Sequence, residues 1–262
     1  MHPLLRDGPL IGVVHLPPTP GAPGARGMGA LLERARSDAL AFARGGVRSL
    51  IVENFHDAPF TKDSVAPETV AALALAVRAV GDLDGVASVG VNVLRNDVRS
   101  ALGVAAAAGA TFVRANVHTG AMFTDQGLIE GRAYETLRVR AALCPSVLLL
   151  ADVHVKHATP VTGEPLEAAA RDAALRGRAD ALIVSGSATG SAPDVARIAR
   201  VRDAVGDSVP LLVGSGLTPS NAVELLGPAD GAIVGTAAKS EGAVDRPVDV
   251  DRVRALVRAA GY

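Results

Sequence analysis

The sequence predicts one (β/α)8 barrel, the TIM-barrel fold, with residues 1–262 forming a single domain. Two observations predict this fold. Short aliphatic runs alternate with helix-like runs along the whole chain, and no Pro- or Ser-rich linker divides it. The length of 262 residues also suits a barrel, because such barrels commonly reach about 250 residues as one unit. An open doubly wound sheet is the rival arrangement, which the pattern alone does not exclude.

Eight runs rich in small aliphatic residues are the expected strands, because such side chains suit strands that helices cover on both faces. They are Leu10–Leu16, Arg48–Glu53, Ser88–Leu94, Thr111–His118, Ser146–His154, Ala179–Ser185, Val209–Gly214 and Gly231–Gly235. The chain is 49% hydrophobic but has no Trp, 2 Tyr and 5 Phe, so Ala, Val and Leu are expected to fill the core.

Stretches with Ala, Leu, Arg and acidic residues at helical spacing separate these strands. They are Gly29–Arg44, Glu68–Val80, Asp97–Ala108, Ile129–Leu143, Pro165–Arg176, Pro193–Val205, Pro219–Leu226 and Val250–Ala260. The Pro- and Gly-rich stretch at residues 17–24 directly follows the first strand. We therefore expect it to form a long first loop and not a domain boundary.

The charge balance and the single cysteine exclude several classes of protein. The formal net charge is −1, so nothing favours a nucleic-acid partner or an anionic membrane. Basic residues such as Arg252 and Arg254 are expected on solvated helix faces. Cys144 has no partner for a disulfide, and no apolar run is long enough for membrane insertion. We expect a cytoplasmic protein, and the Ala- and Arg-rich composition resembles that of a high-GC bacterium.

Polar side chains gather at the carboxyl ends of five expected strands, which is the rim where barrel active sites lie. Because strand residues alternate between two faces, residues spaced by two are expected to share a face. This rim set comprises His15, Glu53, Asn92, Arg114, Asn116, His118, Asp152, His154 and Lys156. Burying an unpaired charge costs several kcal/mol, which is on the order of the total stability of a domain. The convergence of several charged side chains at this rim therefore favours a functional site over a chance arrangement.

These residue types point to acid–base chemistry. We expect Asp152 or Glu53 to be the general base and His118 or His154 the general acid. Substrate contacts are expected from six polar side chains, which are His15, Asn92, Asn116, Lys156, Ser185 and Ser187.

Two other chemistries fit parts of the same rim. His15, Glu53, Asp152 and His154 would form a divalent metal site, although no helical His-x-x-x-His or Cys-based spacing supports one. Lys156 would serve as a Schiff-base lysine if it were desolvated. Contact with a phosphate or carboxylate is the favoured role of Lys156, because it lies beyond the strand end.

Glycine-rich turns follow the last two expected strands. Gly214-Ser215-Gly216 ends the seventh strand, and Gly235-Thr236 ends the eighth. Glycine lets backbone N–H groups approach an anion closely, and the loops after strands seven and eight of barrels commonly bind phosphate. The turns therefore predict a phosphate site, with a small phosphorylated molecule as the ligand.

Long segments resemble the BtpA/SgcQ family over nearly the whole chain. The resemblance is carried by Ile11–Pro18, Ala151–Ala158, Ala179–Gly190, Val213–Gly216 and Ala229–Thr236. It implies a barrel of the ribulose-phosphate-binding type. The family takes its name from a role in photosystem I biogenesis, while other members resemble proteins of sugar metabolism. No catalytic residues are carried over from the family.

Three functions are open at this point. The favoured one is an enzyme of lyase, isomerase or nucleosidase type acting on a phosphorylated sugar or nucleotide-like molecule. The second is a non-catalytic assembly or biogenesis factor, which would need an exposed apolar partner surface. The third and least favoured is an FMN-binding enzyme, in which the same turns hold the flavin phosphate. A homo-oligomer is an expectation from the fold alone.

Overall fold

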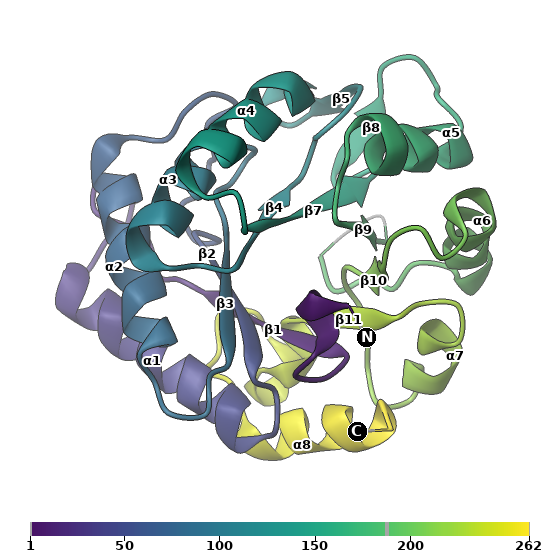
Figure 1. The fold of residues 1–262 in the computed structure, drawn as a ribbon. Coiled ribbons are helices and arrows are strands. Elements are labelled where there is room, and N and C mark those ends of the chain that lie inside the picture. Colours follow the sequence, from purple (N-terminus) through teal and green to yellow (C-terminus); the bar gives the residue numbers. More distant parts are fainter. Residues whose placement is uncertain (1, 187–188, 262) are drawn as a thin grey trace.

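The chain folds as a closed barrel of eight parallel strands surrounded by helices (Figure 1). A computed structural model describes residues 2–186 and 189–261. Ser187, one of the expected substrate-binding residues, lies outside the described residues. The barrel strands are, in their order around the barrel, β1 (Leu10–His15), β2 (Ser49–Glu53), β3 (Ser88–Asn92), β4 (Phe112–Ala115), β7 (Leu148–Val153), β9 (Ala181–Val184), β10 (Leu211–Val213) and β11 (Gly231–Val234). The predicted TIM barrel is thus confirmed, and the open sheet is excluded.

Helices follow the barrel strands and form the outer layer, as Figure 1 shows. They are α1 (Met28–Arg44), α2 (Pro67–Gly81), α3 (Val98–Ala108), α4 (Ala133–Leu143), α5 (Leu166–Arg171) continued by the π-helix η2 (Asp172–Arg176), α6 (Val195–Val205), α7 (Ala222–Leu226) and α8 (Val250–Ala259). Short 3-10 turns are η1 (Pro3–Leu5), η3 (Thr236–Ala238) and η4 (Ser240–Gly242). Ala, Leu and Val occupy the buried helix faces, as the amphipathic spacing predicts.

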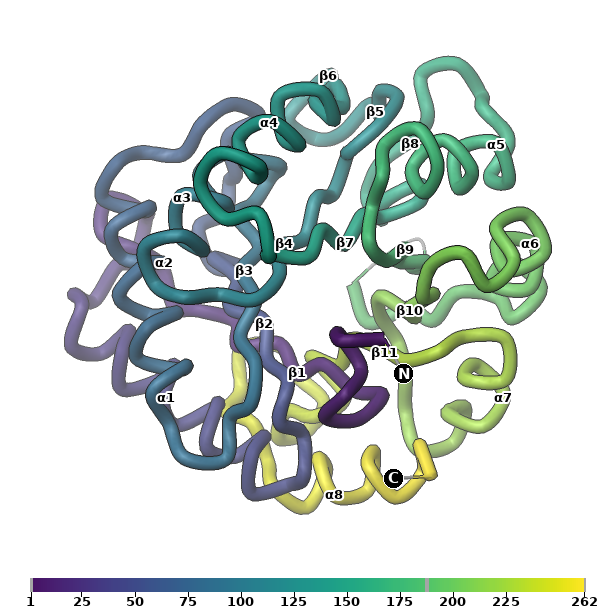
Figure 2. Tube along the Cα trace, viewed as in Figure 1, coloured from purple at the N-terminus to yellow at the C-terminus, as the bar shows by residue number. Residues whose placement is uncertain are grey.

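A small antiparallel sheet outside the barrel was not predicted. It consists of β5 (Ala121–Thr124), β6 (Gly127–Glu130) and β8 (Ala158–Pro160), which lie in the order β6-β5-β8 at the upper edge of Figure 2. The prediction that a helix begins at Ile129 is wrong, because Ile129 pairs with Met122 in the hairpin and α4 begins at Ala133. Both side chains are buried in a satellite core under the hairpin.

The barrel interior follows the two-residue alternation of its strands. One layer of inward side chains is apolar, and includes Ile11, Ile51, Phe112 and Ile233. Gly90 leaves space in this layer, because a Cβ there would lie 2.1 Å from the Phe112 ring. The N-terminal turn η1 packs Leu4 and Leu5 against this core, and Figure 1 shows the purple N-terminal segment across the barrel opening. The amino end of the barrel is therefore closed by apolar packing.

Candidate functional site

A polar layer lies above the apolar interior, at the carboxyl ends of the barrel strands. Its residues follow the inward apolar residues by two positions along each strand, so they point into the barrel. The layer consists of His15, Glu53, Asn92, Arg114, Asp152, Ser185, Gly214 and Gly235, all of them sequence-predicted rim or turn positions. The alternation argument therefore holds for the residues that lie within or directly beyond the strands.

Glu53 is the carboxylate that faces open space in this layer. Its side chain is buried, and its Oε2 accepts a hydrogen bond of 2.5 Å from Asn92 Nδ2. Glu53 lines both of the cavities described below. The amide of Asn92 fixes the orientation of the carboxylate, while the other carboxylate oxygen is available to a ligand. This geometry suits a general acid or base.

Asp152 is held by its neighbours instead of facing the cavities. Its two oxygens accept hydrogen bonds from Arg114 Nε and Nη2, both at 2.8 Å, and Asn116 Nδ2 donates to Oδ2 at 3.1 Å. The Asp152 side chain is 0% exposed. We therefore revise the expected role of Asp152 as a general base, because a carboxylate with a bidentate guanidinium partner is poorly placed to take a proton. Asp152 instead orients Arg114, which does line the cavities.

Lys156 extends into the same space from the loop after β7. Burial and the nearby Arg114 guanidinium lower the pKa of the Lys156 ammonium below its usual value, although Glu53 acts in the opposite direction. Arg95 Nη2 donates to the Lys156 carbonyl oxygen at 2.7 Å and fixes this part of the loop. A lysine with a lowered pKa gives up its proton more readily than a fully solvated one, which suits a general acid.

His15 lies at the end of β1 against the last strand. Its ring is so close to Gly235 that a Cβ there would lie 2.8 Å from His15 Cε1. Burial and the positive charges of Lys239 and Lys156 hold the pKa of His15 well below its usual value, so the ring is neutral at pH 7. Nδ1 is buried and has no hydrogen-bond partner among the residues that the structure describes.

The predicted phosphate turns form one side of the first cavity, whose volume is about 280 Å³. Lining residues from these turns are Gly214, Ser215, Gly216, Gly235 and Thr236. Gly216 has a φ of +75°, and a Cβ there would lie 2.1 Å from the backbone N of Ala192. Only glycine fits this approach between the two loops.

Several backbone N–H groups of these turns have no backbone partner in the part of the chain that the structure describes. Within residues 2–186 and 189–261, those of Ser215, Gly216, Gly235 and Thr236 donate to no backbone oxygen. The Ser215 hydroxyl is already used, since it donates to the Ser191 carbonyl oxygen at 2.8 Å. Unpaired amides beside a cavity are the donor set that a phosphate accepts from.

Arg252 adds a positive charge to this first cavity, and its side chain is exposed, as the sequence predicted. It comes from the first turn of α8, and its Nε donates to the Ala237 carbonyl oxygen at 3.0 Å. The guanidinium thereby stays beside η3 and lines the cavity. An arginine next to free amides strengthens the case for a bound anion.

The second cavity, of about 450 Å³, continues from the first. Glu53, Arg114, Lys156 and Thr189 line both, so the two form one cleft with two parts. Asn92 and Asn116 line the second part, and the Oδ1 atoms of both are buried without a partner among the residues with described placement. Buried polar atoms are normally hydrogen-bonded, so these oxygens indicate a ligand or water with donor groups.

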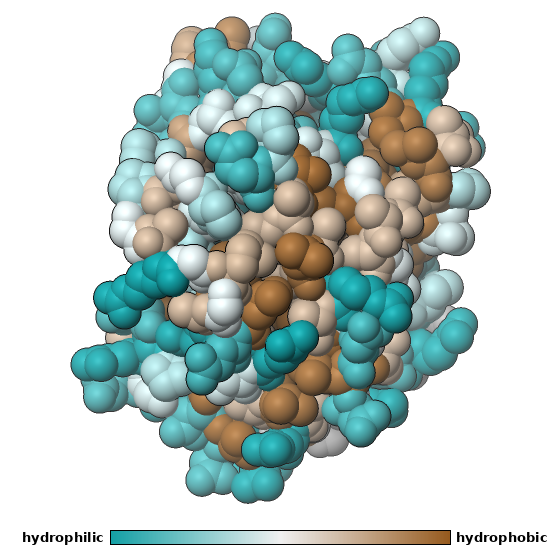
Figure 3. All heavy atoms as spheres, turned by 90° about the vertical axis from the view of Figure 1, so that its left-hand side faces the viewer, coloured by the Kyte–Doolittle hydropathy of each residue, from teal (hydrophilic) through white to brown (hydrophobic). Residues whose placement is uncertain are grey.

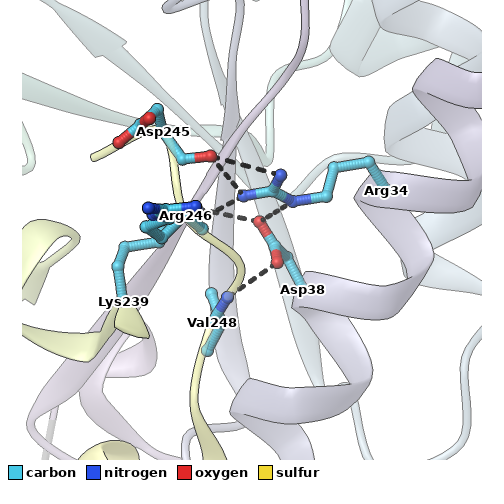
Figure 4. A network of polar contacts seen from close by, with 6 residues as sticks. All are labelled: Arg34, Asp38, Lys239, Asp245, Arg246 and Val248. Atoms are coloured by element: carbon cyan, nitrogen blue, oxygen red, sulfur yellow. Dashed lines mark hydrogen bonds and ion pairs between the residues drawn. The ribbon is translucent and has the colours of Figure 1, made fainter. Parts of the chain in front are cut away.

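A buried ion-pair network ties the loop after β11 to α1 (Figure 4). Lys239 Nζ donates to Asp38 Oδ2 at 2.8 Å, and Asp38 Oδ1 accepts from the Val248 backbone N at 2.9 Å. Arg34 Nε also donates to Asp38, at 3.0 Å, and its guanidinium contacts the Asp245 carbonyl oxygen. The network fixes the loop that connects η3 to α8, and so the position of Arg252.

His118 does not lie in the cleft, contrary to the prediction that it is a general acid. Strand β4 ends at Ala115, so the two-residue alternation stops before His118. The ring points outward, where its Nε2 donates to the Gly177 carbonyl oxygen at 2.7 Å. Burial lowers the pKa of this imidazole. His118 therefore has a structural role at the outer edge of the barrel.

His154 is likewise directed away from the cleft. Strand β7 ends at Val153, and His154 has a φ of +52°, which turns its side chain out of the alternation. Its pKa is lowered by burial and by the nearby charge of Arg197 on α6, and Glu167 on α5 is also close. His154 therefore lies near α5 and α6, and it does not line either part of the cleft.

The four residues of the alternative metal site are not brought together. His15 and Glu53 lie in the cleft, but Asp152 is bonded to Arg114 and His154 lies outside. No three His, Cys, Asp or Glu side chains in the described part of the chain converge on one point. The donor set that the sequence indicated therefore does not fit a metal ion.

Three comparisons place the chain among known proteins. Photosystem I biogenesis protein BtpA of Synechocystis sp. is 46% identical over 252 residues, which cover 96% of this chain and 87% of that protein. An uncharacterised protein of Pyrococcus abyssi is 43% identical, with 97% and 96% of the two chains covered. The relatives are therefore not confined to bacteria. Among solved structures, thiamine phosphate pyrophosphorylase from Pyrococcus furiosus shares the fold, with a TM-score of 0.60, 16% identity, and 96% and 95% of the chains covered.

The family model described as the BtpA family matches residues 6–261, nearly the whole chain. No helix in the described part of the chain has the length and apolarity needed to cross a membrane. The match of the family model and the 46% identity of the Synechocystis protein agree with each other. The chain belongs to the BtpA family.

Proposed function

We propose that the protein is an enzyme that acts on a small phosphorylated sugar or nucleotide-like molecule by acid–base chemistry at the carboxyl rim of the barrel. One observation carries this proposal. Free backbone amides and Arg252 at one end of the cleft adjoin a buried carboxylate, Glu53, and a lysine with a lowered pKa, Lys156. The first set holds an anion, and the second set moves protons.

The phosphate would dock on the turns at Gly214–Gly216 and Gly235–Thr236, with Arg252 neutralising part of its charge. Binding energy from this remote group would hold the reacting carbon beside Glu53 and Lys156. Glu53, oriented by Asn92, takes the proton, and the Lys156 ammonium gives one to the oxygen or nitrogen on which negative charge develops. Arg114, held in place by Asp152, stabilises that charge.

These roles suit lyase, isomerase and nucleosidase chemistry alike, since each needs a proton taken at one atom and given at another. Of the expected reacting groups the proposal keeps Glu53 as the general base and drops Asp152, and Lys156 takes the place of His118 and His154 as the general acid. Solved barrels of similar fold include a protein named for thiamine phosphate, which agrees with a phosphorylated ligand here.

A second candidate is a non-catalytic assembly factor, which is favoured by the name of the Synechocystis relative. Figure 3 shows hydrophobic residues in a band between hydrophilic margins on the face at the left of Figure 1. Leu75 of α2 is 55% exposed, so the helical surface is not uniformly polar. A flavin bound by the glycine turns is a third and less favoured reading, which predicts a yellow protein.

Turnover with a substrate panel separates these candidates. The purified protein is incubated with pentose phosphates, nucleosides and nucleoside monophosphates, with and without a divalent metal, and products are followed by mass spectrometry. The proposal expects turnover of at least one phosphorylated compound, with loss in Glu53→Gln. No product from any phosphorylated compound, together with no phosphate-ester binding in calorimetry, contradicts the proposal and favours the assembly factor.

A further inference from the structure

We propose that the substrate carries a flat aromatic group at the end opposite its phosphate, as in a nucleoside 5′-monophosphate. This inference rests on the proposed function and names the class of molecule that the second part of the cleft accepts. We call that part the aromatic lobe, and define it by its apolar lining residues Phe55, Ala58, Phe60 and Leu94. The first cavity, which holds the glycine turns, is the phosphate lobe.

The two Phe side chains of the aromatic lobe are unusual in this chain. The protein has 5 Phe and no Trp, so a partly exposed aromatic surface is scarce. Phe42 and Phe112 are fully buried in the core, and Phe123 lies on the outer hairpin. The two that remain are Phe55 and Phe60, which both come from the loop after β2. Both side chains line the cleft and are half-buried. Aromatic faces of this kind are what bases stack on.

The loop that carries these two side chains is held rigidly. Asn54 Oδ1 accepts from the Leu94 backbone N at 2.8 Å, and Asn54 Nδ2 donates to Asp57 Oδ2 at 3.0 Å. The Asp57 carboxylate also accepts from the backbone N and the hydroxyl of Thr19, at 2.7 and 2.8 Å. Phe55 itself packs against His15, with ring centroids 4.5 Å apart. Because this loop is already ordered in the free protein, it loses little conformational freedom when a ligand binds, which favours affinity.

The polar atoms between the two lobes suit a sugar-like linker. Glu53, Arg114 and Lys156 line both lobes, so the middle of a bound molecule would lie beside them. The Oδ1 atoms of Asn92 and Asn116, which have no partner within residues 2–186 and 189–261, need donors, and hydroxyl groups supply them. Asp125 of the β5–β6 turn also lines the aromatic lobe, and its carboxylate would accept from a ring N–H. The order phosphate, hydroxyl-bearing linker and aromatic ring matches the order of the lining residues.

The test compares parts of such a molecule by calorimetry. The probes are ribose 5-phosphate, adenosine, and the four monophosphates AMP, GMP, CMP and UMP. We expect at least one monophosphate to bind about tenfold or more tightly than ribose 5-phosphate, because stacking on one aromatic side chain accounts for a factor of this order. We expect adenosine to bind more weakly than AMP, because it lacks the phosphate.

Three variants locate the effect. Phe55→Ala and Phe60→Ala should remove the advantage of the monophosphate and leave ribose 5-phosphate binding within about twofold of the wild type. Phe123→Ala, on the outer hairpin, is the matched control and should change neither. If Phe55→Ala fails to fold, Phe55→Leu keeps an apolar side chain in the loop but removes the ring, and is expected to show the same selective loss.

The outcomes separate this inference from the proposed function. If ribose 5-phosphate binds and none of the four monophosphates binds more tightly, the aromatic lobe has no such role, while the phosphate site stands. If the monophosphate advantage is unchanged in both Phe variants, the inference is equally overturned. If no phosphorylated probe binds at all, the proposed function fails and the inference fails with it.

Discussion

Arg114 and Asp152 form a bidentate ion pair across the neighbouring strands β4 and β7, with Nε–Oδ2 and Nη2–Oδ1 distances of 2.8 Å. Both side chains are almost completely buried, at 4% and 0% exposure. The sequence predicted a catalytic role for Asp152, but in the structure its carboxylate holds the Arg114 guanidinium, which lines the cleft. Two planar groups with two parallel hydrogen bonds allow little rotation, so Arg114 has one well-defined position.

Breaking this pair should cost much more stability than removing it entirely. In Asp152→Asn the Arg114 charge stays buried with a weaker partner, and we expect the free energy of unfolding to fall by about 3–5 kcal/mol. In the double variant Arg114→Met with Asp152→Leu neither charge of the pair remains, so the loss should be clearly smaller. Urea unfolding followed by circular dichroism measures both. A double variant less stable than Asp152→Asn would show that the pair itself is strongly stabilising.

Replacing Glu53 should strongly slow catalysis and spare the fold. In Glu53→Gln the side-chain oxygen can still accept from Asn92 Nδ2, so the local geometry is retained. The amide cannot take a proton, and we expect the rate with any substrate found to fall by about 10²–10⁴. Steady-state kinetics give the rate, and thermal unfolding checks the fold. A variant with full activity would exclude Glu53 as the general base.

Arg252 should contribute to phosphate binding, whereas its neighbour Arg254 should not. Both arginines are exposed, but Arg252 lines the phosphate lobe, while Arg254 pairs with Asp251 at 2.9 Å on the same helix. We expect Arg252→Gln to weaken ribose 5-phosphate binding by about tenfold or more, since hydrogen bonds to charged groups contribute about 1.5–3 kcal/mol. Calorimetry with Arg254→Gln as the control measures the difference. Equal affinities of the two variants would place the phosphate elsewhere.

His15 should make the folded protein less stable in mild acid. Its pKa in the folded state lies well below the value of 6.5 that the unfolded chain shows, so below that pH the unfolded state binds an extra proton. The free energy of unfolding should therefore fall as the pH drops from 7 through 6.5, by up to about 1.4 kcal/mol per pH unit for this one group. Stability is regained as the pH rises again.

Urea unfolding between pH 7 and pH 5 tests this dependence. The slope of stability against pH should become shallower in His15→Gln. The exposed His157, replaced by Gln, is the control, because its imidazole is less buried and should contribute less. A slope that His15→Gln leaves unchanged would mean that the imidazole has the same pKa in the folded and unfolded states, which contradicts the expected lowering.

The barrel itself was predictable from sequence, since all eight strand positions are confirmed within a few residues. The period-two rule also placed His15, Glu53 and Asn92 correctly, because they are the last residues of β1, β2 and β3. It failed for His118 and His154 because the strands end before them. Strand ends depend on how the following loop packs, which a one-dimensional pattern does not contain.

The residues that the sequence did not indicate come from loops and from a helix. Arg252 is brought to the cleft by the packing of α8 beside η3 and by the Lys239–Asp38 ion pair, a contact between residues 201 positions apart. One sequence feature could have indicated Phe55 and Phe60. Two of the few aromatic residues of the chain follow Glu53, a rim carboxylate, within a single loop. The outer sheet was missed because strands of three and four residues give little periodicity.

The most direct test of the central claim is a crystal structure of the protein with ribose 5-phosphate bound. We expect the phosphorus between the turns at Gly216 and Gly235, with phosphate oxygens within hydrogen-bond distance of their backbone N atoms and the sugar pointing toward Glu53. A phosphate bound away from both turns, or a sugar directed away from Glu53, would contradict it.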